Sequence, residues 1–318
     1  MPSELLSMHK ALNKALHDSM QEDENIIVYG QDVASCGGVF RITDNLKEKF
    51  GTKRIFNTPL SECLLAGMTV GMALHGIKPI CEIQFMGFAY STLDQMINHI
   101  SRIYYRSKNI KNCPCVFRIP YGGQIPAPEH HADSYEQLFA TIPGLQVITP
   151  SDAQMAYTLL RNCIKDNNPT VFLEPIYCYH QKDRVDCDIK IDHLNSRVIR
   201  TGKKITIIAW GGMIKTIQQA LSHSPYRDDY TLIDLLCLNP IDYKNIFTSV
   251  AATKKCLIIQ DAHSQVSIAS ELSANITERL FSKLAMPVIR LTAPNSIQPP
   301  FRYREQYYPN KDKIVKEV

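Results

Sequence analysis

Apolar segments of two kinds alternate along almost the whole chain, and this alternation constrains the fold more than any other feature. Short, near-continuous apolar runs such as IIVYG, CVFRIP, TVFLEP and ITIIAW are typical of buried strands. Longer stretches between them repeat apolar residues with a helical period, and the first has Met8, Leu12, Ala15, Leu16 and Met20. The alternation predicts an α/β protein with parallel sheets covered by helices on both faces.

The predicted elements fall into two series. In the first series we expect helices at residues 8–20, 61–75 and 92–106, and a fourth helix that starts after an N-cap at Ser151 or Asp152 and ends near residue 165. We expect strands at residues 26–30, 79–85, 115–120 and 170–175, and one within LQVIT. In the second series we expect strands at 205–210, 231–238, 256–261 and 287–291, and helices at 213–223, through 246 and at 266–284.

A charged, weakly periodic stretch over residues 176–204 separates the two series. A chain of 318 residues suits two domains that each bury a core of their own. We therefore place the interdomain connection there. This predicts a first domain over residues 1–185 and a second over 186–318.

Composition excludes several classes of partner. The net charge is only +4 and the Lys and Arg residues are scattered, which argues against nucleic-acid and membrane-surface binding. No apolar run reaches the roughly 18 residues of a membrane span, and MPSELLSMHK lacks a signal-peptide core, so a cytoplasmic location is expected. The ten cysteines lie singly or inside apolar runs, and the Cys113 and Cys115 pair has no second pair at zinc-ligand spacing.

The loop PYGGQIPAPEHHADS, residues 120–134, concentrates groups that can do chemistry. His130 and His131 are candidates for acid–base work because an imidazole titrates near neutral pH. One of two adjacent histidines normally points away from a shared site, so at most one is expected to be catalytic. Asp133 and Glu129 are present either to orient that ring or to cap the loop.

Two more candidates lie near the ends of predicted elements. Glu62, in NTPLSECLLAGM, is at the first turn of an apolar helix, where a carboxylate is most simply a partner of the helix dipole. No cation follows it, so a buried Glu62 would alternatively hold or share a proton with a ligand. Phe88 follows a strand end, where an aromatic ring either packs in the core or stacks on a planar ligand.

Three further motifs could suggest a binding or catalytic site. CIKDNNP, residues 163–169, is either a helix-ending turn or an oxygen-lined monovalent-cation site, and the residues alone favour the turn. WGGM, residues 210–213, lacks the spacing of a dinucleotide fingerprint. DAHS, residues 261–264, has no GxSxG nucleophile elbow to complete a hydrolase site.

Taken together, the motifs resemble one family. GVFRITDNLKEKFG, RIFNTPLSE, KPICEIQF, RIYYRS, PYGG, PEHHADS, IPGLQVITPSD and IKDNNPTVFLEP follow one another as in the β subunits of thiamine-diphosphate-dependent 2-oxoacid dehydrogenases. The resemblance covers nearly the whole chain and is greatest to the pyruvate dehydrogenase type. It implies a transketolase-like pyrimidine-binding domain followed by a transketolase C-terminal domain.

The resemblance also implies roles for single residues. Glu62 matches the glutamate that hydrogen-bonds the 1′ nitrogen of the cofactor's aminopyrimidine, and Phe88 matches the aromatic residue that packs on that ring. His131 matches the loop histidine near the reacting carbon. The potassium site of some relatives corresponds to Cys115, Cys163, Ile164, Asp166 and Asn168, mainly through backbone carbonyls.

The remaining implications concern partners. The GDG…N signature that holds magnesium and diphosphate is absent from this sequence, so an α subunit in an α2β2 heterotetramer is expected to supply it. Cys63, Leu64 and HSQVSIAS at residues 263–270 depart from the family pattern. The first two are expected to reshape the pyrimidine pocket, and the third to alter contacts with subunits or the core.

These implications predict the β subunit of a pyruvate dehydrogenase decarboxylase component. With its α subunit it would decarboxylate pyruvate on thiamine diphosphate and acetylate lipoyl groups of an acyltransferase core. A branched-chain 2-oxoacid or acetoin enzyme is the close alternative, although phenylalanine rather than tyrosine at Phe88 favours pyruvate. A non-catalytic paralogue and a nicotinamide-binding oxidoreductase are the alternatives from other classes.

Overall fold

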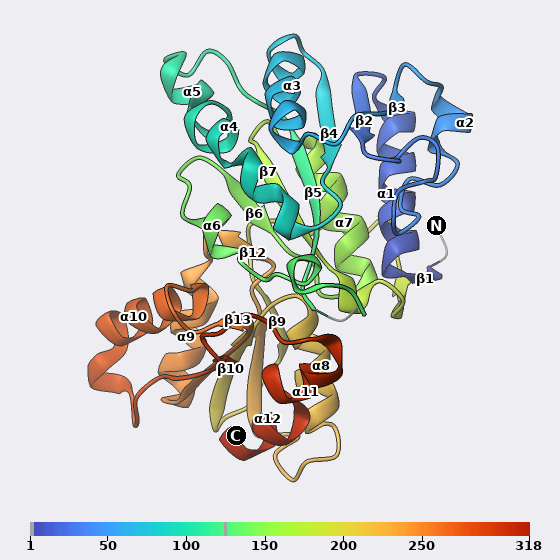
Figure 1. Ribbon diagram of the computed structural model, residues 1–318. Coiled ribbons are helices and arrows are strands. Elements are labelled where there is room, and N and C mark those ends of the chain that lie inside the picture. The colour runs from blue at the N-terminus through green and yellow to red at the C-terminus, as the bar shows by residue number, and fades with distance from the viewer. Residues whose placement is uncertain (1–2, 124–125) are drawn as a thin grey trace.

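The computed structural model describes residues 3–123 and 126–318. The chain forms two α/β units, which lie one above the other in Figure 1. The first unit contains a seven-stranded sheet in the order β12-β6-β7-β5-β4-β2-β3. Its strands are β2 (Ile26–Gly30), β3 (Ile55–Asn57), β4 (Lys78–Glu82), β5 (Val116–Tyr121), β6 (Gln146–Ile148), β7 (Thr170–Pro175) and β12 (Cys237–Asn239).

Helices cover both faces of this sheet. Residues along β5 alternate between the faces, since Phe117 and Ile119 join one buried cluster and Val116 joins another. The helices on the Val116 side are α1 (Met8–Glu22) and α7 (Ala153–Lys165); those on the opposite side are α3 (Glu62–Leu74) and α4 (Leu93–Asn98). The layered first domain expected from the sequence is therefore present.

The second unit contains a five-stranded sheet in the order β14-β13-β10-β11-β9. Its strands are β9 (Arg197–Arg200), β10 (Ile205–Ala209), β11 (Tyr230–Asp234), β13 (Cys256–His263) and β14 (Ile289–Ala293). Helices α8 (Gly212–Leu221) and α12 (Lys311–Glu317) cover one face, and α9 (Tyr243–Thr253) and α10 (Ile268–Leu280) cover the other.

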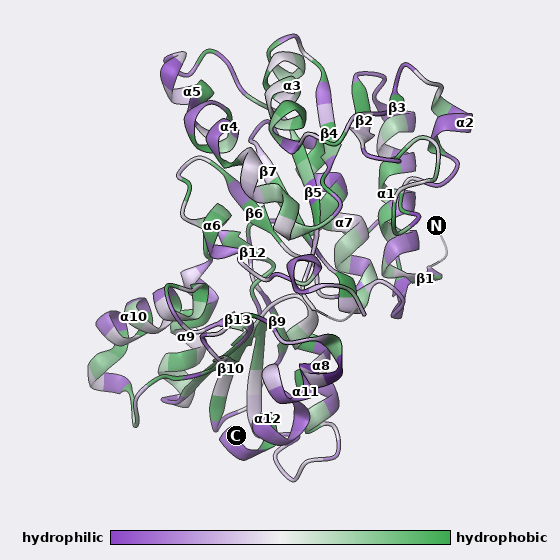
Figure 2. Cartoon of the chain, viewed as in Figure 1, coloured by the Kyte–Doolittle hydropathy of each residue, from purple (hydrophilic) through white to green (hydrophobic). Residues whose placement is uncertain are grey.

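Shorter elements connect these layers. They are β1 (Glu4–Ser7), α2 (Leu46–Phe50), η1 (Met86–Thr92), η2 (Ile100–Arg102), α5 (Ile103–Arg106), η3 (Glu129–His131), α6 (Gln137–Ala140), η4 (Ile176–Cys178), β8 (Lys182–Val185), η5 (Phe281–Lys283), η6 (Phe301–Tyr303) and α11 (Arg304–Tyr307). Figure 2 shows that hydrophobic residues concentrate in the strands, whereas α2 and α12 are largely hydrophilic. Each helix in the described part of the chain is too short or too polar to span a membrane.

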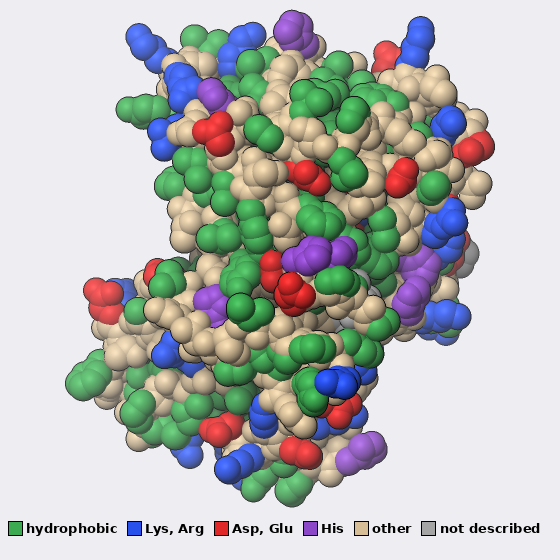
Figure 3. Space-filling model, in the orientation of Figure 1, with side chains coloured by type: hydrophobic (Ala, Val, Ile, Leu, Met, Phe, Trp, Pro, Cys, Tyr) green, Lys and Arg blue, Asp and Glu red, His purple; other side chains and the backbone are tan. Residues whose placement is uncertain are grey.

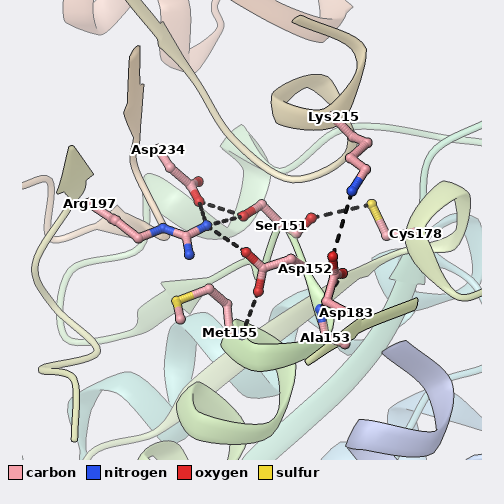
Figure 4. A network of polar contacts seen from close by, with 9 residues as sticks. All are labelled: Ser151, Asp152, Ala153, Met155, Cys178, Asp183, Arg197, Lys215 and Asp234. Carbon is pink, nitrogen blue, oxygen red and sulfur yellow. Dashed lines mark hydrogen bonds and ion pairs between the residues drawn. The ribbon is translucent and has the colours of Figure 1, made fainter. Parts of the chain in front are cut away.

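The two units share a core. A single buried cluster includes Ile119 of β5, Trp210 after β10 and Ile258 of β13. A polar network also crosses the junction, as Figure 4 shows: the Arg197 guanidinium contacts Asp152 at 2.7 Å and Asp234 at 3.0 Å. Burial raises the pKa of Asp234 to about 6, although Arg197 opposes that shift. The two units are therefore joined by both apolar and ionic contacts.

Three expectations about elements differ from the structure. The helix predicted at 92–106 is divided into α4, η2 and α5, with a break at His99, whose φ is −122° and ψ −69°. The strand predicted at 231–238 is divided because Leu236 takes a left-handed φ of 57°, and β12 then leaves the second sheet to pair antiparallel with β6. The stretch expected to be a linker contains β9, which pairs antiparallel with β11. The seven-stranded and the five-stranded sheet are thus each parallel apart from one antiparallel edge strand, β12 in the first and β9 in the second.

Candidate functional site

The histidine loop, defined here as residues 120–136, leaves the carboxyl end of β5 and lies over the junction of the two units. Residues 124 and 125 of this predicted loop lie outside the described part of the chain. Figure 3 shows histidine side chains beside acidic ones at the waist of the visible face, where the two units meet. In α/β sheets ligands bind beyond the carboxyl ends of the strands, so this position suits a functional loop.

The His131 side chain packs against two phenylalanine side chains. Its ring centroid is 4.7 Å from that of Phe85 and 5.3 Å from that of Phe88, with both pairs edge-on. Burial, followed by the charge of His130, lowers the pKa of His131, so its imidazole is neutral near pH 7. Its Nδ1 is buried against the loop backbone, where the Pro128 carbonyl lies near the ring and partly offsets the lowering of the pKa. The neutral ring can accept a proton.

The two adjacent histidines do not point apart, contrary to the expectation from sequence. Their ring centroids are 4.3 Å apart, and His130 also lies 5.9 Å from Phe88. Both rings belong to the 3₁₀ turn η3, in which consecutive side chains diverge by about 120° rather than by the 180° of a strand. His130 is exposed and His131 is partly buried.

Of the two neighbouring carboxylates, Asp133 anchors the loop to η1, whereas Glu129 lies beside His130. Asp133 Oδ2 accepts a 2.7 Å hydrogen bond from the Tyr90 hydroxyl, and the Asp133 carbonyl accepts one from the Gly122 amide. Glu129 lies 4.0 Å from His130 Nδ1. Gly87 in η1 packs beneath the loop, where an added Cβ would lie 2.1 Å from the His130 carbonyl oxygen.

Phe88 and Glu62 lie on adjoining elements. Phe88 is partly buried in η1, and α3, whose first residue is Glu62, packs against η1. Glu62 is partly exposed, so this chain alone leaves room for a ligand or a partner chain beside its carboxylate. Leu60 and Leu64 on either side are 67% and 49% exposed, which marks an uncovered apolar surface around Glu62.

Cys63 and Leu64 lie on the exposed surface beside Glu62, and their expected effect on the pyrimidine pocket stays a prediction. Both side chains are exposed, because they occupy the outward turn at the start of α3 while Leu65 and Ala66 face the core. The other departure from the family pattern, at 263–270, forms the end of β13 and the N-terminus of α10. Val266 there is exposed with a left-handed φ of 47°.

A buried ion network underlies the site. Arg118 of β5 donates two hydrogen bonds to Glu174, at 2.7 and 2.9 Å, and one to Glu82 at 2.7 Å. The Tyr179 hydroxyl donates a further bond to Glu174 at 2.6 Å. Burial raises the pKa of Glu82, while the Arg118 charge opposes that effect. These contacts fix the carboxyl ends of β4, β5 and β7 relative to one another.

The second domain also reaches the loop, through residues that sequence reasoning missed. The Ser134 hydroxyl donates to Asp261 Oδ2 at 3.2 Å, and the Trp210 indole N–H donates to Glu136 Oε1 at 2.9 Å. Trp210 and Asp261 begin the two motifs that were set aside as dinucleotide and hydrolase signals. Their nearness to the loop depends on contacts across the domain junction, which no local pattern reveals.

The residues predicted to bind a cation lie at and near the turn that follows α7, and hydrogen bonds within this chain hold that turn. The Asp166 carboxylate accepts hydrogen bonds from the Asn168 backbone and side chain at 2.8 Å and pairs with His193 at 3.0 Å. The Cys115 carbonyl accepts the Thr170 amide at 2.9 Å. Cys163 and Ile164 lie buried in the last turn of α7. The described residues hold no group of three or more His, Cys, Asp or Glu side chains arranged for a metal ion.

Two large cavities lie away from Glu62, Phe88 and His131. One of about 620 Å³ is at the amino ends of β5 and β7, beside Tyr104, Tyr105 and Cys113. Another of about 740 Å³ is between the domains, beside Gln137, Tyr243 and Glu271. Glu62, Phe88 and His131 line neither of these cavities, and each is partly exposed, as a site that a second chain covers would require.

Comparisons with known proteins bear on the fold and the family. The family described as "Transketolase, pyrimidine binding domain" matches residues 4–179, and "Transketolase, C-terminal domain" matches residues 195–314. A solved structure titled "Split gene transketolase, inactive beta4 tetramer" superposes with a TM-score of 0.80 at 20% identity, covering 98% of this chain and 96% of that chain. The two matched families and the fold thus define a transketolase-like protein.

Curated relatives narrow the family. The 3-methyl-2-oxobutanoate dehydrogenase subunit beta of Mycobacterium tuberculosis is 36% identical over 98% of this chain and 90% of its own length. The pyruvate dehydrogenase E1 component subunit beta of Staphylococcus epidermidis is 35% identical over 98% and 97%. The chain belongs to the family of E1 β subunits of 2-oxoacid dehydrogenases. Enzymes of this family depend on thiamine diphosphate.

Proposed function

We propose that the chain is the β subunit of a pyruvate dehydrogenase E1 component, and that it forms half of a thiamine-diphosphate site completed by an α subunit. The observation that carries the proposal is the contact of His131 with Phe88 on an element that packs against the Glu62 helix. The exposed Leu60 and Leu64 support a second chain over this face. When bound, thiamine diphosphate would supply the nucleophilic carbon and the electron sink for decarboxylation.

Each residue has a role in the proposal. Glu62 would hydrogen-bond the pyrimidine 1′ nitrogen. Its carboxylate is partly exposed in this chain, so a ligand can reach it, and a partner chain would then bury it. Phe88 would pack against the pyrimidine ring. His131 would exchange a proton with the substrate, because a neutral imidazole can accept one.

The proposal includes partners and ions that extend beyond this chain. An α2β2 heterotetramer is expected, with magnesium and diphosphate held by the α subunit, and the acyl group would pass to lipoyl groups of an acyltransferase core. Potassium would bind mainly through the backbone carbonyls of Cys115, Cys163, Ile164, Asp166 and Asn168. We keep a cytoplasmic location as part of the proposal.

We also propose the domain boundary between residues 185 and 186. The strand before it, β8, pairs with β1 of the first unit, and the next strand, β9, pairs with β11 of the second. These pairings support a division between β8 and β9. Limited proteolysis that cut first within either sheet, and not near this boundary, would contradict the division.

The substrate requires its own experiment, because the named relatives include both pyruvate and 3-methyl-2-oxobutanoate enzymes. The reconstituted complex should be supplied with pyruvate, 3-methyl-2-oxobutanoate and acetoin. Reduction of an artificial acceptor is followed for all three, and CO2 release only for the two 2-oxoacids, because acetoin has no carboxylate to lose. The proposal predicts the highest kcat/KM for pyruvate. A higher value for either competitor would assign the chain to that enzyme, and inactivity on all three would favour a non-catalytic paralogue.

A histidine variant tests the site in the same assay. His131→Ala is expected to lower kcat by roughly 10²-fold or more, since general acid–base catalysis contributes about 10²–10⁴-fold. His223→Ala, a substitution of an exposed histidine in the second domain, is the matched control and should leave kcat unchanged. Equal activity of both variants would remove His131 from the proposed chemistry.

A further inference from the structure

Three consecutive residues of the histidine loop each contact the second domain. Ser134 donates to Asp261 at 3.2 Å, the Tyr135 ring packs edge-on against His263 at 5.3 Å, and Glu136 accepts from Trp210 at 2.9 Å. Asp261 and His263 lie on β13, and Trp210 directly follows β10. The contacts thus come from the carboxyl ends of two adjacent parallel strands of the second sheet.

The residue before these three is held by the first domain. Asp133 is bonded through its side chain to Tyr90 of η1 and through its carbonyl to the Gly122 amide. The loop backbone immediately after His131 therefore passes from an anchor in one domain to anchors in the other. Only Ala132 separates His131 from this series.

The junction is closely packed beside Ser134 and Gly123. A cavity of only about 20 Å³ remains between Ser134, Asp261 and Tyr308. At the start of the loop, an added Cβ on Gly123 would lie 2.1 Å from both the Tyr308 hydroxyl and Gln298 Nε2. Small movements of the second domain would therefore be transmitted to the loop, because close-packed contacts leave little free volume.

We propose that the second domain acts as a clamp on the histidine loop, in which Asp261, His263 and Trp210 are positioning residues for His131. The proposal rests on the proposed function, since it assigns His131 to the chemistry. The three residues do not touch His131; they fix the loop segment that carries it. The clamp explains how a domain remote from the cofactor face contributes to the site.

A minimal variant tests the clamp in the complete chain. Ser134→Ala removes one hydroxyl and with it the bond to Asp261, whereas Ser222→Ala removes an exposed hydroxyl elsewhere in the second domain and serves as control. Hydrogen exchange should become faster across residues 126–136 in Ser134→Ala only, with exchange in α1 unchanged. Unchanged exchange in the loop would overturn the clamp.

Turnover of the reconstituted complex provides the second readout. Misplacement of a catalytic group by about 1 Å can cost roughly 10²-fold, so Ser134→Ala and Asp261→Ala should lower kcat by about 10- to 100-fold without changing the KM for thiamine diphosphate. Asp261→Asn retains an oxygen that can accept from Ser134 and should recover most of the loss. Faster exchange with unchanged kcat would overturn the positioning role.

The two readouts separate failure of the clamp from failure of the proposed function. If the wild-type complex decarboxylates none of the 2-oxoacids, the proposed function fails, whereas the exchange experiment still reports the clamp. If the wild-type complex is active and Asp261→Asn is as impaired as Asp261→Ala, the Ser134 bond is not the positioning contact and the clamp is overturned.

Discussion

At the residue scale, Arg118 is fully buried between Glu82 and Glu174, with hydrogen bonds to both. Replacing Arg118 with Met would leave two carboxylates buried without a cation. We expect a loss of about 3–5 kcal/mol in the free energy of unfolding, as is usual when one partner of a buried pair is removed. Urea denaturation measures this change.

The exposed pair of Lys204 and Asp229 provides the control for that measurement. Because solvent screens exposed ion pairs, Lys204→Ala should change the free energy of unfolding by less than about 1 kcal/mol. An Arg118→Met chain as stable as the Lys204→Ala chain would contradict the view that this network holds the strand ends together.

Glu136 should make stability depend on pH. Burial, followed by the charge of Asp261, raises the pKa of Glu136 to about 8, from an ordinary value of 4.5. The folded chain then binds more protons than the unfolded chain between these values. Stability should therefore fall as the pH rises from about 4.5 to 8, with a slope approaching about 1.4 kcal/mol per pH unit for one proton.

Glu136→Gln tests this dependence, because glutamine keeps an acceptor for the Trp210 indole but does not titrate. The other titratable groups facing Glu136 are Asp261, Tyr121 and Tyr90. Asp261, whose pKa burial raises to about 6, will still titrate in the variant. The stability curve should be flatter between pH 6 and 8 in Glu136→Gln, and identical curves would disprove the assignment. Trp210 is the only tryptophan of the chain, so its fluorescence offers a local probe.

The residues of the candidate site differ in how far the sequence reveals them. Glu62, Phe88 and His131 were singled out because they lie in motifs near element ends. Phe88 and His131 are indeed in contact, and Glu62 lies on the helix packed against η1. Glu136, Asp261 and Trp210 were not singled out, because their pairing joins positions more than 70 residues apart. Long-range pairs between domains leave no periodic or local signal.

At the scale of elements, the close approach of η1 to the histidine loop depends on Gly87. An added Cβ there would lie 2.1 Å from the His130 carbonyl oxygen, so Gly87→Ala must push the two segments apart. We expect a cost of about 1–3 kcal/mol, as for overpacking, together with lower turnover in the reconstituted complex.

Gly71 in α3 is the matched position, because a Cβ built there meets no atom within 4 Å. Gly71→Ala should stabilise the isolated chain by about 0.5–1 kcal/mol, since alanine is the better helix former. Thermal and urea denaturation compare the two variants. If Gly87→Ala were as stable as Gly71→Ala, close packing between η1 and the loop would be refuted.

Elements with a strong periodic pattern were predicted well and those decided by tertiary contacts were not. Helix α1 and strands β2 and β7 occur where their apolar patterns place them. The division of the predicted strand at 231–238 was missed, because LLCL is apolar in either sheet and only the left-handed Leu236 redirects it. Strand β9 was missed because an edge strand has little apolar patterning.

At the scale of the whole molecule, the shared core predicts that the two domains unfold together. The buried cluster that joins β5, Trp210 and β13 would be exposed if either domain unfolded alone. Urea unfolding followed by Trp210 fluorescence and by far-ultraviolet circular dichroism should therefore give one coincident transition. Two separated transitions would show that the domains are independently stable.

The molecule as a whole presents an open half-site, and we propose that a second chain completes it. The most direct test is a calorimetric titration of thiamine diphosphate, with magnesium, into the chain alone and into complexes reconstituted with wild-type or Glu62→Gln chains. We predict no binding to the chain alone, saturable binding to the wild-type complex, and binding at least about tenfold weaker with Glu62→Gln, equal to about 1.4 kcal/mol. Tight binding to the isolated chain, or equal affinity of the two complexes, would contradict the claim.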